Sequence, residues 1–300
     1  MRALFLVTYT ADCEKNWQSW KCIGNTCHVE QYDNRPHDRQ REIVELAKNL
    51  KPNVIVYIGA IERYHRRPVL KPDILKQLRD IAPSVHIVGD ASDKPWWEWL
   101  TLYDIQDCFS LQVSIDGSFD TPLVESDNGM IKLTPTDPKP FGAPPWEMKD
   151  IFCGMAGGLG HGERMMLVNY LTSTRALTWR RDLSFEDMAS FLGQCRIVVN
   201  SPMNGTGDSV HVKGRVVEAG WAGACLLERA NICTSHWFSD DLYMRYRFPI
   251  DAQARIEWAR SNDGEIADMA RRFHEVVKAE HHPKVFWDDV LARAGVYQDA

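Results

Sequence analysis

The stretch SVHVKGRVVEAGWAGACLLE, residues 209–228, begins with ionisable side chains and continues as an apolar helix. The ionisable residues at its front are His211, Lys213, Arg215 and Glu218. A helix N-terminus presents unpaired backbone N–H groups and a partial positive charge, so cations there are unfavourable unless an anion binds. The pattern therefore predicts an anion site at the start of this helix, with Gly214 in its backbone. In the alternative interpretation, Lys213 and Arg215 extend into solvent.

Glu218 lies one helical turn further along. A carboxylate accepts hydrogen bonds from two neighbouring hydroxyl groups, as a ribose offers them. Glu218 is therefore a candidate for binding a ribose next to the anion. The alternative is a solvated helix carboxylate. Under both interpretations we expect Glu218→Gln to leave the stability of the empty protein nearly unchanged.

Two further candidate groups follow expected strands of the second half. The glycine-rich run GMAGGLGHG, residues 154–162, opens a helix, so Gly157 and Gly158 would allow a diphosphate to approach, with Arg164 behind them. Arg180 follows the apolar run RALTW, where it could meet a base or a phosphate. The alternative for the glycine-rich run is a flexible loop, and the alternative for Arg180 is a surface charge.

In the first half, Asp90 ends the run SVHIVGD and is a candidate base for deprotonating an acceptor hydroxyl. Asp116 is a second candidate, and a turn or helix cap is the alternative role for either acid. Arg63, His65 and Arg66 follow the strand-like run NVIVYIGA. They could bind an anionic acceptor or nucleic acid, or form a solvated basic loop.

Short β-branched runs alternate with helical spacing through both halves of the chain, which predicts parallel sheets with crossover helices. In the first half we expect strands at 2–9, 53–60, 84–90, 109–116 and 129–134, with helices at 38–50 and 72–82. In the second half we expect strands at 150–157, 175–179, 196–200 and 224–228, with helices at 162–173, 184–194, 213–223, 263–282 and 283–294.

The segment TPTDPKPFGAPPW has five prolines in thirteen residues and separates the expected strands and helices of the two halves. This composition predicts an interdomain linker. The predicted fold class is α/β, with two Rossmann-like domains facing across a cleft. Residues 1–140 would form the first domain and residues 148–300 the second, with the last helix packing back on the first. Ligands bind at the carboxyl ends of such parallel strands.

The run GRVVEAGWAGACLLE, preceded by RIVVNSP and followed by SHWFSDDLYMRY, resembles the donor-binding region of GT-B glycosyltransferases, especially the CgeB-like, glycosyltransferase family 1-like group. The resemblance extends to DIFCGMAGGLGHGERMMLVNYL and HHPKVFWDDVL and covers residues 150–292. It implies a nucleotide-diphosphate sugar held by the second domain without metal or other cofactor, with Glu218 on the ribose and the helix start near the diphosphate.

The chain departs from this group in one respect. Retaining members of the fold carry two acidic residues separated by seven, and Val210 stands where the first would be, with Asp208 out of step. Retention or inversion of the anomeric centre is therefore open.

Composition limits the remaining choices. Hydrophobic residues make up 44% and charged residues 25% of 300, as in a folded protein, and no apolar run is long enough to cross a bilayer. We expect a cytoplasmic, metal-independent hexosyltransferase whose acceptor binds the first domain. A net charge of -6 disfavours DNA as a partner. The alternatives are a sugar-nucleotide epimerase of the same fold, a DNA-base-modifying glycosyltransferase, and a non-catalytic nucleotide-sugar-binding module.

Overall fold

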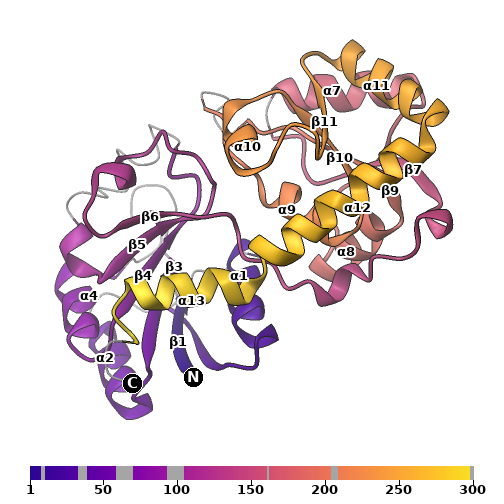
Figure 1. The fold of residues 1–300 in the computed structure, drawn as a ribbon. Helices are drawn as coiled ribbons and strands as arrows, with labels where there is room; N and C mark the ends of the chain where they lie inside the picture. Colours follow the sequence, from indigo (N-terminus) through magenta and orange to yellow (C-terminus); the bar gives the residue numbers. More distant parts are fainter. Residues whose placement is uncertain are drawn as a thin grey trace. The chain divides into compact units, whose positions relative to one another are not determined.

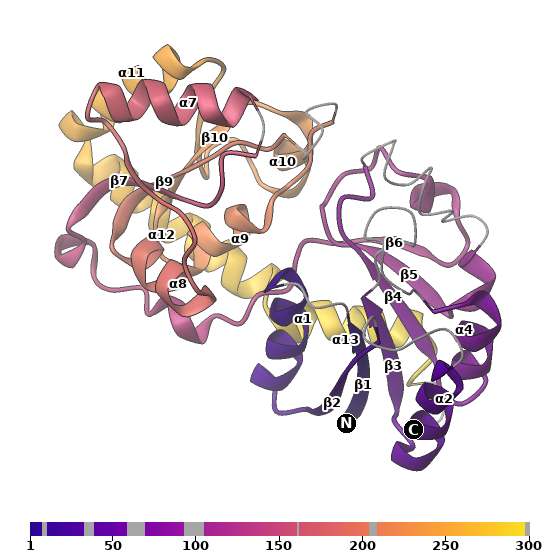
Figure 2. The same ribbon diagram turned by 180° about the vertical axis from the view of Figure 1, so that it is seen from behind.

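The computed structural model describes residues 1–7, 11–32, 39–58, 70–92, 105–160, 162–203 and 209–297 (Figures 1 and 2). The chain divides into two compact units. Unit 1 consists of Met1–Asp137 and Pro283–Ala300, and unit 2 is Pro138–His282. The chain enters unit 2 within the proline-rich segment, and its last helix returns to unit 1.

Unit 1 contains a six-stranded parallel sheet in the order β2-β1-β3-β4-β5-β6. Its strands are β1 (Arg2–Val7), β2 (Thr26–Gln31), β3 (Val54–Ile58), β4 (Ser84–Val88), β5 (Leu111–Ser114) and β6 (Gly129–Ile131). Every residue of the central strands β3 and β4 is buried. Such continuous burial is typical of a parallel sheet that helices cover on both faces.

The C-terminal helix α13 (Pro283–Arg293) covers one face of this sheet together with α1 (Ala11–Cys22), as Figure 1 shows. The ring of Trp287 packs edge-on against Trp20, with centroids 5.1 Å apart, and its Nε1 donates to Ser19 Oγ at 3.0 Å. Helices α2 (Arg41–Leu50) and α4 (Pro72–Arg79) cover the opposite face with a second apolar cluster. The two ends of the chain are therefore joined in one core.

Unit 2 contains a five-stranded parallel sheet in the order β11-β10-β9-β7-β8. Its strands are β7 (Ile151–Ala156), β8 (Thr178–Arg180), β9 (Cys195–Asn200), β10 (Cys225–Arg229) and β11 (Met244–Tyr246). The prediction of two Rossmann-like α/β units is confirmed by the two parallel sheets.

Helices cover both faces of the unit 2 sheet (Figure 2). They are α7 (Gly162–Ser173) and α11 (Pro249–Ser261) on one face, α8 (Phe185–Gly193) and α9 (Gly214–Trp221) on the other, and α12 (Asp263–Glu280), which packs on α9 and β10. The short α10 (Ile232–Trp237) follows β10. Gly220 allows α9 and α12 to approach closely, because a Cβ there would stand 2.4 Å from Cγ2 of Val277. Among the helices that the structure describes, none has both the length and the apolarity of a membrane span.

Two local features fix the helices on the α8 and α9 side. Ser184 caps α8 by accepting a hydrogen bond from the backbone N–H of Asp187 at 3.1 Å. The buried Nζ of Lys149 donates to the carbonyl of Gly193 at 2.5 Å and to that of Ala222 at 2.8 Å. These carbonyls belong to the last turns of α8 and α9, where a cation interacts favourably with the helix dipole. Burial nevertheless lowers the pKa of Lys149 to about 8.

Several elements were not predicted from the sequence: α1, β2, α10, β11 and α11. Strand β2 lies at a sheet edge and contains no fully buried residue, so it lacks the apolar run that identifies a central strand. Strand β11 has only three residues. The predicted strand at 175–179 is shifted, because Arg175 adopts a left-handed conformation and β8 begins at Thr178.

Candidate functional site

The carboxyl ends of the unit 2 strands bring a group of the predicted site residues together. Gly157 and Gly158 follow β7, and Ser201 follows the neighbouring strand β9. Gly157 has a φ of +125°, which favours glycine, and its N–H donates to the carbonyl of Arg180 at the end of β8. The turn after β7 is thus fixed at the edge of the sheet where ligands bind in parallel α/β folds.

Arg164 connects two of these turns from the first turn of α7. Its Nη1 donates to the carbonyl of Gly158 at 3.3 Å, and its Nη2 donates to the carbonyl of Ser201 at 3.2 Å. Burial lowers the pKa of Arg164, and the nearby positive charge of Arg215 lowers it further. Arg164 and Arg215, which come from different helices, thus form a pair of guanidinium groups at the Gly157–Gly158 turn.

Arg215, the second residue of α9, is the other guanidinium of this pair. A Cβ at Gly157 would stand 3.6 Å from its Nη2, so the glycine turn and Arg215 are in contact range. Its Nη1 lies 2.8 Å from Oε2 of Glu218, and its side chain is only 16% exposed. The alternative in which Arg215 extends into solvent is therefore wrong.

Glu218 has no exposed surface, so the interpretation as a solvated helix carboxylate is also wrong. Because Arg215 and Glu218 are three positions apart on α9, they lie on one helix face. The ion pair offsets part of the cost of a cation near a helix N-terminus and of a carboxylate in the interior. Gln at position 218 would leave the guanidinium without this partner, so the structure favours a loss of stability in the empty protein over the neutral substitution that the sequence predicts.

The structure thus groups five predicted residues: Gly157, Gly158, Arg164, Arg215 and Glu218. Three others lie beside them along the chain. His211 is buried, and its backbone N–H donates to the carbonyl of Pro202 at 3.1 Å. Lys213 is the half-buried N-cap residue of α9, and Gly214 is the first residue of that helix. The side chain of Arg180 is exposed at the end of β8.

A buried acid that the sequence analysis did not identify completes this edge. The carboxylate of Glu228, in β10, accepts hydrogen bonds from Nδ2 of Asn200 at 2.8 Å and of Asn231 at 3.3 Å. Burial raises the pKa of Glu228 to about 8, while the bond from Asn200 and the charge of Arg164 act in the opposite direction. The signal in the sequence was the polar last residue of RIVVN and of ACLLE, since a polar residue ending an apolar strand marks the ligand-binding edge.

The candidates of unit 1 have different surroundings. Asp90 is exposed just after β4 and adopts a left-handed conformation with φ of +54°, which is uncommon for a residue other than glycine. Asp116 is buried and accepts hydrogen bonds from Ser92 N at 3.2 Å and from Ser114 Oγ at 2.6 Å. Asp116 therefore anchors the loops after β4 and β5, which favours a structural role over that of a base.

The basic group of Arg63, His65 and Arg66 lies outside the described residues. Within the described ranges, no three His, Cys, Asp or Glu side chains are grouped as a metal site requires.

A family model matches the part of the chain in which the grouped residues of unit 2 lie. Residues 157–292 match a family model described as glycosyl transferase-like, and this segment contains the glycine turn, both guanidinium groups and both buried acids. No curated protein sequence matches the chain.

Solved structures match over nearly the whole chain. Anabaena Alr3699/HepE in complex with UDP and glucose superposes with a TM-score of 0.67 at 10% identity, covering 98% of this chain and 99% of that one. An alpha-glucosyltransferase in complex with UDP and DNA containing an HMU base gives a TM-score of 0.65 at 9% identity, covering 98% and 99%. The chain has the GT-B fold. A glycosyltransferase from Rickettsia africae shares this fold, with a TM-score of 0.64 at 7% identity over 100% and 99% of the two chains.

Proposed function

We propose that the protein is a glycosyltransferase that moves a sugar from a nucleotide-diphosphate sugar to an acceptor. The observation that carries this proposal is the meeting of Arg164 and Arg215 at the Gly157–Gly158 turn. Two guanidinium groups beside a backbone with little steric bulk suit a diphosphate, for which Arg215 would exchange its ion pair with Glu218. The family match over the same segment and the GT-B fold support this interpretation.

In this proposal the donor lies along the carboxyl edge of the unit 2 sheet. Arg164 and Arg215 bind the diphosphate, with Lys213, His211 and the first N–H groups of α9 beside it. Glu218 binds the ribose hydroxyls after its ion pair with Arg215 has loosened to admit the ligand. Arg180 lies on the base side, where its exposed side chain leaves room for a planar ring.

The proposed chemistry follows from the charge that develops during transfer. Breaking the bond between the sugar and the diphosphate gives the sugar oxocarbenium character and places additional negative charge on the leaving diphosphate. Arg164 and Arg215 stabilise that charge more strongly in the transition state than in the ground state, so they act as the main catalytic groups without metal or other cofactor.

The acceptor belongs to unit 1 in this scheme. Asp90, exposed at the carboxyl end of β4, would take the proton of the attacking hydroxyl, with Arg63, His65 and Arg66 contributing to the binding of an anionic acceptor. Since the two acidic residues of retaining members are not both present, the proposal does not specify the stereochemical outcome. The proposed subgroup is the CgeB-like one.

The test is a thermal-shift panel of nucleoside diphosphates and nucleotide sugars, beginning with UDP and UDP-glucose because similar folds bind them. A ligand present at 100 times its dissociation constant stabilises the folded protein by about 2.7 kcal/mol, which gives a clear shift in Tm. We expect stabilisation of the wild type, and a smaller shift for Arg164→Gln. The exposed Arg175→Gln is the matched control, because it removes one positive charge from the same unit. If no nucleoside diphosphate or nucleotide sugar stabilises the wild type, the proposal fails.

A further inference from the structure

Unit 2 has a pocket at β11, which is an edge strand of its sheet and is distant from the glycine turn. It has a volume of about 530 Å³ and lies between the end of β11 and the first half of α11. Its walls include three arginines, Arg245, Arg247 and Arg255, and one acid, Asp251. A cavity of this size accommodates a small ligand.

The charges of this pocket are unbalanced. Arg245 pairs with Asp240 at 2.5 Å, whereas Arg247 and Arg255 form no ion pair with any residue in the part of the chain that the structure describes. The carboxylate of Asp251 accepts hydrogen bonds from the backbone N–H groups of Arg247 and Phe248 at 3.3 Å each. Three guanidinium groups, set against the carboxylates of Asp240 and Asp251, leave a local excess of one positive charge in a protein with a net charge of -6.

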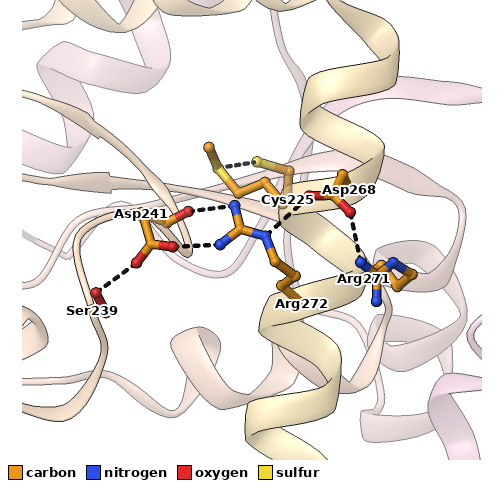
Figure 3. Close-up of polar contacts among 7 residues, drawn as sticks. Cys225, Ser239, Asp241, Asp268, Arg271 and Arg272 are labelled. Atoms are coloured by element: carbon orange, nitrogen blue, oxygen red, sulfur yellow. Dashed lines mark hydrogen bonds and ion pairs between the residues drawn. The ribbon is translucent and has the colours of Figure 1, made fainter.

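A polar network around Arg272 holds the loop that precedes β11 (Figure 3). Arg272 of α12 donates to the carboxylate and, at 3.0 Å, to the carbonyl of Asp241, and its Nε donates to Asp268 at 3.0 Å. Ser239 donates to the other oxygen of Asp241 at 2.5 Å. The loop that leads into β11 is therefore attached to α12, and the pocket does not depend on a loose segment.

The pocket is separate from the donor site. Tyr246 lines it, and the hydroxyl of Tyr246 donates to the carbonyl of Asn200 at 2.8 Å. The end of β11, which forms one wall of the pocket, is three strands away from β7, the strand that precedes the Gly157–Gly158 turn. The pocket and the proposed donor site therefore occupy different positions along the carboxyl edge of the unit 2 sheet.

We propose that this pocket binds a phosphate group of a second ligand, held by Arg245, Arg247 and Arg255. Guanidinium groups suit phosphate because each presents parallel N–H donors to two phosphate oxygens. The phosphate can belong to a free phosphate ester or to a lipid headgroup. Phe248 and Ile250, which flank the pocket residues in sequence, are each 64% exposed and would suit an apolar portion of either ligand.

Arginine modification by phenylglyoxal, followed by mass spectrometry, tests this proposal residue by residue in the wild-type protein. The probe is inorganic pyrophosphate at low ionic strength. At about three times the dissociation constant, we expect modification of Arg247 and Arg255 to slow by about fourfold. Modification of Arg271, an exposed residue of α12, should keep its rate. The same measurement with vesicles of phosphatidylcholine containing phosphatidic acid, and with pure phosphatidylcholine vesicles, distinguishes a headgroup from a free ester.

A pair of double variants completes the test. In Arg247→Gln/Arg255→Gln, Arg245 should lose its protection by the phosphate probe. In the control Arg271→Gln/Lys278→Gln, which removes the same charge from exposed positions of α12, the protection of Arg245 should remain. Protection by pyrophosphate assigns the pocket to a free phosphate ester, and protection only by the phosphatidic acid vesicles assigns it to a headgroup. Absence of protection by both, or unchanged protection of Arg245 in the pocket double variant, overturns the proposal.

Discussion

The guanidinium of Arg215 lies 2.8 Å from the carboxylate of Glu218, and Glu218 has no exposed surface. The pair lies in the first two turns of α9, next to the Gly157 turn. A buried carboxylate at this position has two roles in our interpretation. It compensates Arg215 in the empty protein, and it becomes available to ribose hydroxyls when a diphosphate takes over the guanidinium.

The first prediction concerns the stability of this pair. Glu218→Gln leaves a largely buried guanidinium without its carboxylate, so we expect the free energy of unfolding to fall by about 3 kcal/mol, measured by urea denaturation. The exposed Glu265→Gln should change it by less than about 0.5 kcal/mol. A double-mutant cycle with Arg215→Met then isolates the coupling between the two side chains. Strict additivity of the two substitutions would show that the pair contributes nothing to folding.

The second prediction separates the phosphate contacts from the rest of the donor. Arg164→Gln should weaken UDP binding by about tenfold to hundredfold, because a hydrogen bond to a charged group contributes about 1.5 to 3 kcal/mol. Binding of uridine, which has no phosphate, should not change. Isothermal titration calorimetry with both ligands measures the difference, and Arg175→Gln serves as the control. Equal losses for UDP and uridine would mean that Arg164 only supports the fold.

The third prediction uses the ionisation of Glu228. Burial raises its pKa from the ordinary value of 4.5 to about 8 in the folded protein, so the folded state binds more protons than the unfolded state between these values. The contribution of Glu228 to stability is therefore greatest below pH 4.5 and is lost as the pH rises to 8. Glu228→Gln should remove this loss, so that its stability relative to wild type increases by a few kcal/mol from pH 4.5 to pH 8.

Denaturant unfolding at a series of pH values measures this difference. The exposed Glu265→Gln, treated in the same way, should follow the wild-type pH dependence. A constant difference between Glu228→Gln and wild type across this pH range would contradict the raised pKa.

The fourth prediction concerns Lys149, whose pKa is lowered by burial from 10.5 to about 8. Between these values the unfolded state binds more protons, so the contribution of Lys149 is full above pH 10.5 and is lost as the pH falls to 8. The advantage of wild type over Lys149→Met should therefore grow as the pH rises from 8 to 10.5. A neutral amine at position 149 still donates to the carbonyls of Gly193 and Ala222. At pH 10.5 the Lys149→Met variant should therefore be less stable than wild type by about 1 to 3 kcal/mol.

The matched control for Lys149 is Lys278→Met, an exposed lysine of α12. Its unfolding free energy should differ from that of wild type by less than about 0.5 kcal/mol at each pH. Parallel curves for Lys149→Met and Lys278→Met would contradict the lowered pKa of Lys149, and coincident curves would also show that its two carbonyl contacts do not stabilise α8 and α9.

Much of this molecule is determined locally by its sequence. The buried runs of β3, β4, β9 and β10, alternating with helical spacing, predict parallel sheets, and parallel sheets place their ligands at the carboxyl ends of the strands. The three-residue spacing of Arg215 and Glu218 already places them on one face of a helix. Since these features depend on neighbouring residues, the glycine turn, Arg164 and α9 could be identified before the fold was known.

Only the tertiary structure decided which of these groups are buried and what they contact. Lys149 meets carbonyls that lie 44 and 73 positions away, and Arg164 meets Ser201 at a distance of 37 positions. Burial raises the pKa of Glu228 because residues of β9, β10 and their loops lie around it, and no local pattern specifies that burial. The strength of an electrostatic interaction depends on the dielectric around it, and this is set by the packing of segments that are distant in the chain.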